Sequence, residues 1–225
     1  KRRVLTRALA RPWSRYPDFD PRELLLALAR FSGWRADGIL AGNGSNEAIE
    51  ALLLVTVGSG TKVVIPEPTF TLYALMTTIL GGEPVRVPMS RPGLGLSSRG
   101  SAPSFRAGPS AGGGFAYDVD ALLAARGASG ASVTIVCSPN NPTGTSLSLS
   151  QVDRLCREDD SLVVIDEAYH EFSGRTAVPL LERHPNLVVL RTFSKAMALA
   201  GLRVGYLLAS PELVREVNKA RLPYN

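Results

Sequence analysis

The stretch SLVVIDEAY, residues 161–169, is a run of four apolar residues that ends in acids. A short, continuous and β-branched apolar run predicts a strand that is buried on both faces of its sheet. Similar strands are predicted at KVVIP, PVRVP, SVTIVCS, NLVVLRT and LRVGYLLA, which are residues 62–66, 84–88, 132–138, 186–192 and 202–209. Because helical stretches separate most of these runs, the pattern predicts a three-layer α/β/α fold with a mostly parallel sheet.

The intervening segments favour helices by their apolar spacing and by their start and stop residues. We expect these helices at about residues 21–31, 46–57, 69–81, 118–126, 150–158 and 210–220. Residues 90–114 have a different composition, rich in Ser, Gly, Pro and Arg and without an acid. This segment is predicted to be a flexible insertion at the surface.

Composition limits the class of protein. The chain has 225 residues, of which 45% are hydrophobic and 20% charged, as expected of a soluble domain with a sizeable core. The net charge of +5 comes largely from a basic stretch in the first fifteen residues, which we interpret as a solvated face. No nucleic-acid recognition motif accompanies that stretch. Two cysteines, Cys137 and Cys156, indicate neither a disulfide framework nor a metal site.

The chain contains no apolar run of about eighteen residues and no apolar core of a signal peptide near its first residue. We therefore expect no membrane span and a location in the cytoplasm.

Polar side chains follow three of the predicted strands at their carboxyl ends, where open α/β sheets bind ligands. Asn141 follows the strand at 132–138, and Asp166 and Tyr169 end the strand at 161–169. The next strand leads into a loop that carries Thr192, Ser194 and Lys195. Each residue has an ordinary structural explanation: a turn for the amide, a salt bridge for the acid and solvent exposure for the lysine. Together, an amine, an acid and an amide suit pyridoxal 5′-phosphate (PLP), which needs a Schiff-base lysine, an acid at its pyridine nitrogen and an anion site for its phosphate.

Seven segments carry a resemblance to a known family. They are RYPD (15–18), GNGSNEAIE (42–50), PEPTFTLY (66–73), SPNNPTG (138–144), VIDEAYHEF (164–172), RTFSKAMALAGLRVGY (191–206) and PYN (223–225). In these segments and in this order the sequence resembles the fold-type I PLP enzymes, and within them the histidinol-phosphate aminotransferases. The resemblance covers nearly the whole chain outside the insertion. It implies that residues 36–225 form the large, PLP-binding domain and that residues 1–35 form an N-terminal arm with helical structure.

The resemblance also implies a role for each matching residue. Lys195 would bind the cofactor covalently and move the proton at the substrate Cα, and Asp166 would pair with the pyridine nitrogen. Tyr169 and Asn141 would hydrogen-bond to the ring hydroxyl, although an Asn before Pro is also a turn signal. Phe70 would stack on the ring, unless it is a core residue near a helix start.

The phosphate requires hydrogen-bond donors and positive charge. Ser45 and Asn46 lie at a predicted helix start after two glycines, where free N–H groups and the helix dipole favour an anion. An ordinary N-cap explains them as well. Further donors would be the Thr192 and Ser194 hydroxyls and the Arg203 guanidinium. Tyr16 matches a family tyrosine that reaches the phosphate in the neighbouring subunit, or else it is a packed tyrosine before a turn; the first interpretation implies a homodimer.

The sequence departs from the family pattern at several points. Met197 and Ala198 stand where an aromatic residue and a glycine are usual, and Asn46 stands where an Asp is common. The segment at 90–114 is longer than usual. An N-E-N-P segment expected in the N-terminal arm is missing, and so is the small C-terminal domain whose arginine grips substrate. We therefore expect a chain shortened at both ends.

The resulting prediction is PLP-dependent transamination between histidinol phosphate and 2-oxoglutarate, giving imidazole-acetol phosphate and glutamate. Two other enzyme activities stay open: an aromatic amino acid aminotransferase and a threonine-phosphate decarboxylase. Outside the enzymes, a PLP-binding module, such as half of a transcription regulator, and an inert fragment stay open as well.

Overall fold

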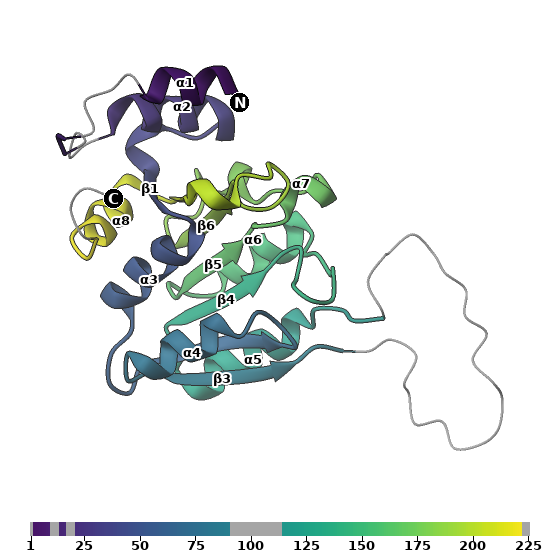
Figure 1. Ribbon diagram of the computed structural model, residues 1–225. Coiled ribbons are helices and arrows are strands. Elements are labelled where there is room, and N and C mark those ends of the chain that lie inside the picture. Colours follow the sequence, from purple (N-terminus) through teal and green to yellow (C-terminus); the bar gives the residue numbers. More distant parts are fainter. Residues whose placement is uncertain (1, 10–13, 17–20, 91–113, 222–225) are drawn as a thin grey trace.

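The computed structural model describes residues 2–9, 14–16, 21–90 and 114–221 (Figure 1). Seven strands form one sheet: β1 (Ile39–Asn43), β2 (Lys62–Glu67), β3 (Glu83–Pro88), β4 (Val133–Cys137), β5 (Leu162–Asp166), β6 (Leu187–Thr192) and β7 (Val204–Leu208). The α-helices are α1 (Arg2–Leu9), α2 (Arg22–Ser32), α3 (Ser45–Thr56), α4 (Leu72–Ile79), α5 (Val119–Ser129), α6 (Leu149–Arg157), α7 (His170–Ser173) and α8 (Pro211–Asn218). Three short 3-10 helices are η1 (Ala36–Gly38), η2 (Val178–Leu180) and η3 (Ala200–Leu202). The predicted insertion lies, but for its end residues 90 and 114, outside the described residues.

The sheet confirms the predicted α/β class and the mostly parallel arrangement. Its strand order is β1-β7-β6-β5-β4-β2-β3. Strand β7 runs antiparallel to β1 and β6, and the pairs from β6 to β3 are parallel. The register places Cys137 beside Asp166 and Asp166 beside Leu190. Because these strands are parallel, their carboxyl ends meet at one edge of the sheet, as the sequence predicts.

Two apolar cores, one on each face of the sheet, account for the three layers. On one face α3, α4 and α8 cover strand residues such as Val164 and Leu190. On the other, α2, α5 and α6 cover the alternate residues, such as Ile165 and Val189. Since successive side chains of a strand point to opposite faces, the central strands carry mostly apolar side chains on both faces. Figure 1 shows the helices on both sides of the sheet.

Strand β1 and helix α7 were not predicted, and helix α1 lies in the arm for which helical structure was expected without bounds. Strand β1 has only Ile39, Leu40 and Ala41 before two polar or small residues, a run too short to stand out. It forms because β7 offers an unpaired edge along its whole length. Helix α1 lies in the basic stretch, where Arg3 and Arg7 are exposed, in agreement with the predicted solvated face.

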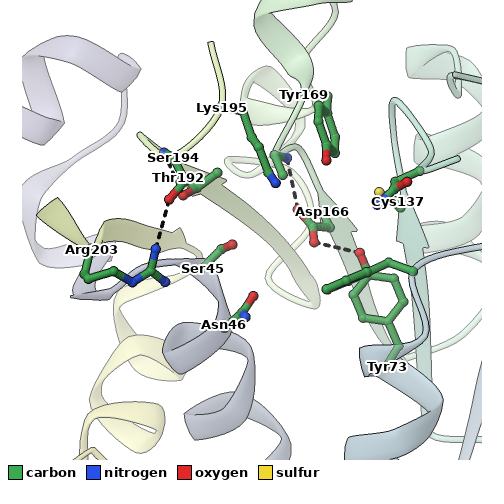
Figure 2. Close-up of a pocket in the computed structure, with 13 residues that line it drawn as sticks. Ser45, Asn46, Tyr73, Cys137, Asp166, Tyr169, Thr192, Ser194, Lys195 and Arg203 are labelled. Carbon is green, nitrogen blue, oxygen red and sulfur yellow. Dashed lines mark hydrogen bonds between the residues drawn. The ribbon is translucent and has the colours of Figure 1, made fainter. Parts of the chain in front are cut away.

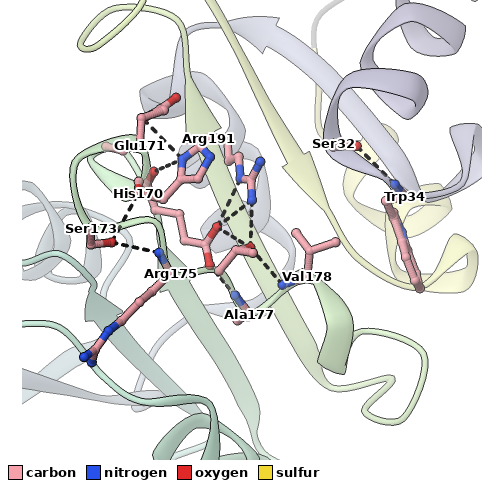
Figure 3. A network of polar contacts seen from close by, with 12 residues as sticks. Ser32, Trp34, His170, Glu171, Ser173, Arg175, Ala177, Val178 and Arg191 are labelled. Carbon is pink, nitrogen blue, oxygen red and sulfur yellow. Dashed lines mark hydrogen bonds and ion pairs between the residues drawn. The ribbon is translucent and has the colours of Figure 1, made fainter.

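A buried polar network stabilises the segment that follows β5 (Figure 3). Glu167 and Arg191 are only 2% and 5% exposed, and the Arg191 Nε and Nη2 atoms donate to Glu167 Oε2 at 3.0 and 2.9 Å. The Thr176 hydroxyl donates to Glu167 Oε2 at 2.9 Å and accepts from Arg191 Nη2 at 2.7 Å and from Val178 N at 3.1 Å. Burial raises the pKa of Glu167, while the Arg191 charge opposes that rise. The charged pair is therefore tolerated because its hydrogen bonds are satisfied.

This network predicts a measurable loss on replacement of Thr176 by valine. The substitution keeps the shape but leaves the Val178 N–H and one Arg191 donor without their acceptor. We expect the free energy of unfolding to fall by about 1–3 kcal/mol, measured by urea denaturation. Thr78→Val is the matched control, because Thr78 is exposed on α4 and bonds only within its helix, to Ala74 O. Equal losses in both variants would contradict the importance of the network.

Candidate functional site

A pocket lies at the carboxyl ends of β4, β5 and β6 (Figure 2). Ten of the eleven predicted site residues line it: Ser45, Asn46, Phe70, Asn141, Asp166, Tyr169, Thr192, Ser194, Lys195 and Arg203. The eleventh, Tyr16, is 81% exposed and does not line this pocket. Three further lining residues, Tyr73, Cys137 and Ala168, were not predicted. Sequence positions from 45 to 203 thus meet in one place.

Asp166 forms the deepest charged group of the pocket. Its side chain is held at both oxygens: Ala168 N donates to Oδ1 at 3.0 Å and Tyr73 Oη donates to Oδ2 at 2.7 Å. Asp166 is 6% exposed, and burial raises its pKa, an effect opposed by the hydrogen bonds from Tyr73 and Ala168 and by the Lys195 charge. Each oxygen keeps a second lone pair that a ligand N–H could use.

Neutral groups surround this carboxylate. Cys137 lies beside it on β4, and burial together with the Asp166 charge raises the thiol pKa to about 12. The Tyr73 pKa also lies well above its ordinary value because the phenol is buried, next to the Asp166 charge. Both groups therefore stay protonated near neutral pH, and Tyr73 can act only as a donor toward the carboxylate.

Lys195 lies in the loop after β6, at the mouth of the pocket. Two backbone hydrogen bonds stabilise the loop: Phe193 N donates to Val204 O at 3.0 Å, and Ala198 N donates to Lys195 O at 2.8 Å. Lys195 Nζ lies 5.4 Å from the centroid of the Tyr169 ring, within the range of a cation–π contact. Figure 2 shows the lysine side chain extending into the pocket, on the side of Tyr169 and above Asp166.

The other end of the pocket has features that favour an anion. Ser45 and Asn46 open the twelve-residue helix α3, whose N-terminal N–H groups and dipole favour negative charge. The N-cap is Gly44 and not Ser45, so the alternative of an ordinary serine cap is wrong. The Arg203 guanidinium adds a positive charge: Nη1 donates to Ser194 Oγ at 3.3 Å and Nη2 to Asn43 O at 3.3 Å.

Two glycines allow the groups of the anion site to approach each other. Gly44 has a φ of +83°, and a Cβ there would lie 2.5 Å from Arg203 Nη2. At Gly205 on β7, a Cβ would lie 2.2 Å from Ser45 N. Any larger residue would therefore separate α3 from β7 or from the guanidinium. The first-turn acid Glu47 turns its carboxylate away to the backbone, where Oε2 accepts from Asn43 N at 2.5 Å.

Phe70 and Asn141 form the remaining wall. The Phe70 ring packs edge-on against Tyr73, with 5.6 Å between centroids and 83° between planes. Asn141 lies in the turn at 141–143, which Gly144 N closes by donating to Asn140 O at 2.8 Å, so its predicted turn role holds beside its place in the pocket. Asn141 itself lines the pocket. The pocket thus combines an amine, a buried carboxylate and an anion site, the three features that PLP requires.

The lysine loop contains a strained residue. Ala198 has a φ of +51°, in the left-handed region that favours glycine. This conformation gives a physical reason for the glycine expected there from the family pattern. We expect Ala198→Gly to raise the free energy of unfolding by about 0.5–1 kcal/mol in urea denaturation, since relief of strain exceeds the entropy that glycine adds to the unfolded chain. The control is Ala196→Gly, equally exposed but without a positive φ, which should lower stability; destabilisation by both would contradict the account.

Within the part of the chain that the structure describes, no helix is long and apolar enough to cross a membrane. The same residues contain no group of three or more His, Cys, Asp or Glu side chains that could hold a metal ion.

Comparison with known proteins places this geometry in a family context. A family model described as aminotransferase class I and II matches residues 2–225. The histidinol-phosphate aminotransferase of Chlorobaculum parvum is 39% identical over all 225 residues, which are 57% of that relative. That of Desulfitobacterium hafniense is 39% identical over 213 residues, which are 95% of this chain and 54% of the relative.

A solved structure agrees with the fold. The histidinol-phosphate aminotransferase from Sinorhizobium meliloti, in complex with pyridoxal-5′-phosphate, superposes with a TM-score of 0.79 and 27% identity. The match covers 97% of this chain and 55% of that one. The chain therefore spans little more than half the length of the relatives it matches.

Proposed function

The chain belongs to the aminotransferase class I and II family, and from this premise we propose that it is the PLP-binding part of a histidinol-phosphate aminotransferase. The proposed reaction moves the amino group of L-histidinol phosphate to 2-oxoglutarate, giving imidazole-acetol phosphate and glutamate. The names of relatives such as those from Chlorobaculum parvum and Desulfitobacterium hafniense support this choice of substrates.

The observation that carries the proposal is the meeting of Lys195, buried Asp166 and the anion site in one pocket. When bound, PLP supplies an acceptor for the electron pair that remains on the substrate Cα after deprotonation. Asp166, when ionised, would hold a protonated pyridine nitrogen through its free lone pairs. The Lys195 amine would hold the cofactor covalently and would serve as the base for the proton at the substrate Cα.

The other pocket residues would hold and orient the cofactor. Tyr169 and Asn141 would hydrogen-bond to the ring hydroxyl, and Phe70 would pack against the ring. The phosphate would lie at the N-terminus of α3, bound by the following set of residues: Ser45, Asn46, Thr192, Ser194 and Arg203. The contact of Arg203 Nη1 with Ser194 Oγ at 3.3 Å supports this assignment, because it brings a charged donor and a hydroxyl together at one place.

The proposal extends to the assembly. We place residues 36–225 in the large domain and residues 1–35 in an arm, and we infer a homodimer in which Tyr16 reaches the phosphate of the partner's site. The high exposure of Tyr16 supports this role. An arginine that grips substrate would come from a small C-terminal domain. The cytoplasmic location stays a prediction.

Substrate profiling of the full-length protein tests the proposed activity. With PLP present, glutamate formation from 2-oxoglutarate is measured with histidinol phosphate, with tyrosine and with phenylalanine as amino donors. We expect the highest kcat/KM with histidinol phosphate. A higher value with the aromatic amino acids, or CO2 release from threonine phosphate, would replace the proposal by one of the two other enzyme activities. Absence of turnover with all donors would favour a PLP-binding module or an inert fragment.

A further inference from the structure

Tyr73 is a buried residue of the pocket whose hydroxyl lies between the Asp166 carboxylate and the Cys137 thiol. It lies on α4 and is 1% exposed. Its Oη donates to Asp166 Oδ2 at 2.7 Å, across 93 positions of sequence. The ring is fixed from one side by the edge-on contact with Phe70, and its backbone carbonyl accepts from Thr77 Oγ1 at 2.8 Å. These contacts fix the position of the ring and so keep the hydroxyl oxygen beside the carboxylate.

Asp166 depends on this hydrogen bond because it has no close cation. Of the residues that the structure describes, none forms an ion pair with it, and Lys195 acts only through its charge at longer range. The other titratable groups that face it are Cys137 on β4 and Tyr117, which precedes α5; both are neutral near neutral pH, because burial raises their pKa. The two hydrogen bonds from Tyr73 and Ala168 are thus the main local compensation for the burial of a negative charge.

The two donors also fix the orientation of the carboxylate. Ala168 N approaches Oδ1 at 3.0 Å and Tyr73 Oη approaches Oδ2 at 2.7 Å, so the carboxylate plane is set at two points. A single donor would leave the group free to rotate about its Cβ–Cγ bond. Rotation would turn the remaining lone pairs away from a ligand in the pocket.

We propose that Tyr73 is a positioning residue for the cofactor, holding Asp166 ionised and turned toward the pyridine nitrogen. This inference rests on the proposed function, since it assigns Tyr73 a part in the same site. The residue acts through Asp166 and not on substrate. It was not apparent in the sequence, where Tyr73 is one more large residue in an apolar helix.

The inference predicts a pH dependence with a definite sign. A hydrogen bond donated to a carboxylate stabilises the ionised form, so its loss in Tyr73→Phe raises the pKa of Asp166. Asp166 then stays protonated up to a higher pH than in the wild type. Affinity for PLP should therefore be lost as the pH falls, and lost earlier in the variant than in the wild type.

The test compares PLP dissociation constants across the pH range in which the full-length protein stays folded, by absorbance titration. For Tyr73→Phe we expect the affinity for PLP to be about tenfold weaker near neutral pH. In a plot of PLP affinity against pH, the fall on the acid side (the acid limb) should move to higher pH by about one pH unit, as for the loss of one hydrogen bond to a charged group. Tyr117→Phe is the matched control, since this buried hydroxyl, in the core on the other face of the sheet, donates to Cys137 O and not to Asp166. We expect its acid limb to coincide with that of the wild type.

Three outcomes separate the inference from the proposed function. An acid limb that shifts in Tyr73→Phe alone supports the inference. Unshifted limbs in both variants, or equal loss of affinity at every pH in both, reduce Tyr73 to a packing residue and overturn it. A wild-type protein that does not bind PLP overturns the proposed function itself. Circular dichroism of each variant checks that the fold is retained.

Discussion

Replacement of Lys195 by alanine should lower transamination by the full-length protein about 10⁴-fold, the upper range for loss of a general acid–base group. The lysine is the one amine among the residues that line the described pocket, so no neighbour can take its place. Turnover is measured as glutamate formation at saturating substrate. Because Lys195 is exposed at the pocket mouth, the variant should unfold at the same urea concentration as the wild type.

Lys219→Ala provides the control for this variant. The Lys219 side chain, at the C-cap of α8, is 69% exposed, pairs with Glu216 and does not line the pocket. We expect its activity to equal that of the wild type. If Lys195→Ala kept more than a small fraction of activity, or if both variants lost activity equally, the assigned role of Lys195 would be wrong.

Replacement of Asp166 by asparagine should separate activity from stability. The amide has the same shape, can accept from Ala168 N and can donate to Tyr73 Oη, but it carries no charge toward the pyridine nitrogen. We expect kcat to fall about 10²–10³-fold, as for removal of one preorganised electrostatic partner. The cofactor-free protein should be as stable as the wild type or more so, because a buried charge has been removed.

Urea denaturation of the cofactor-free protein and initial rates with saturating PLP measure the two effects. The reference variant is Asp153→Asn, since Asp153 is a carboxylate that pairs with Arg183, contacts His184 Nε2 at 2.9 Å and does not line the pocket. That variant should keep its activity and lose some stability. If Asp166→Asn kept the wild-type kcat, the role assigned to Asp166 would be wrong, whatever the stability of the variant.

Much of the fold could be predicted because its strands are buried on both faces. A run such as residues 162–166 has no polar residue before its end, and helical spacing between runs predicts the layers. Strand β1 could not be predicted in this way, since its three apolar residues become a strand only through pairing with β7. Pairing at a sheet edge depends on the tertiary structure and has little local signal.

In the site, too, some residues could be predicted from the sequence and others could not. Lys195, Asp166 and Asn141 could be predicted because each follows a strand whose carboxyl end faces the ligand. Tyr73 could not, since it reaches the pocket from within a helix and its position depends on how α4 packs on the sheet. One sequence feature could have indicated Tyr73: it follows Phe70 by three positions, about one helical turn, so both side chains can lie on the same side. Cys137 could not be predicted either. It lies at the pocket because β4 pairs with β5 in a register that places it beside Asp166, and its residue type gives no sign of this.

Covalent trapping of PLP tests the central claim most directly. The protein is incubated with PLP, reduced with borohydride, digested and mapped by mass spectrometry. The account predicts one labelled residue, Lys195, and no label in a Lys195→Ala variant treated in the same way. A label on another lysine such as Lys62 or Lys219, or wild-type protein that takes up no label, would contradict it.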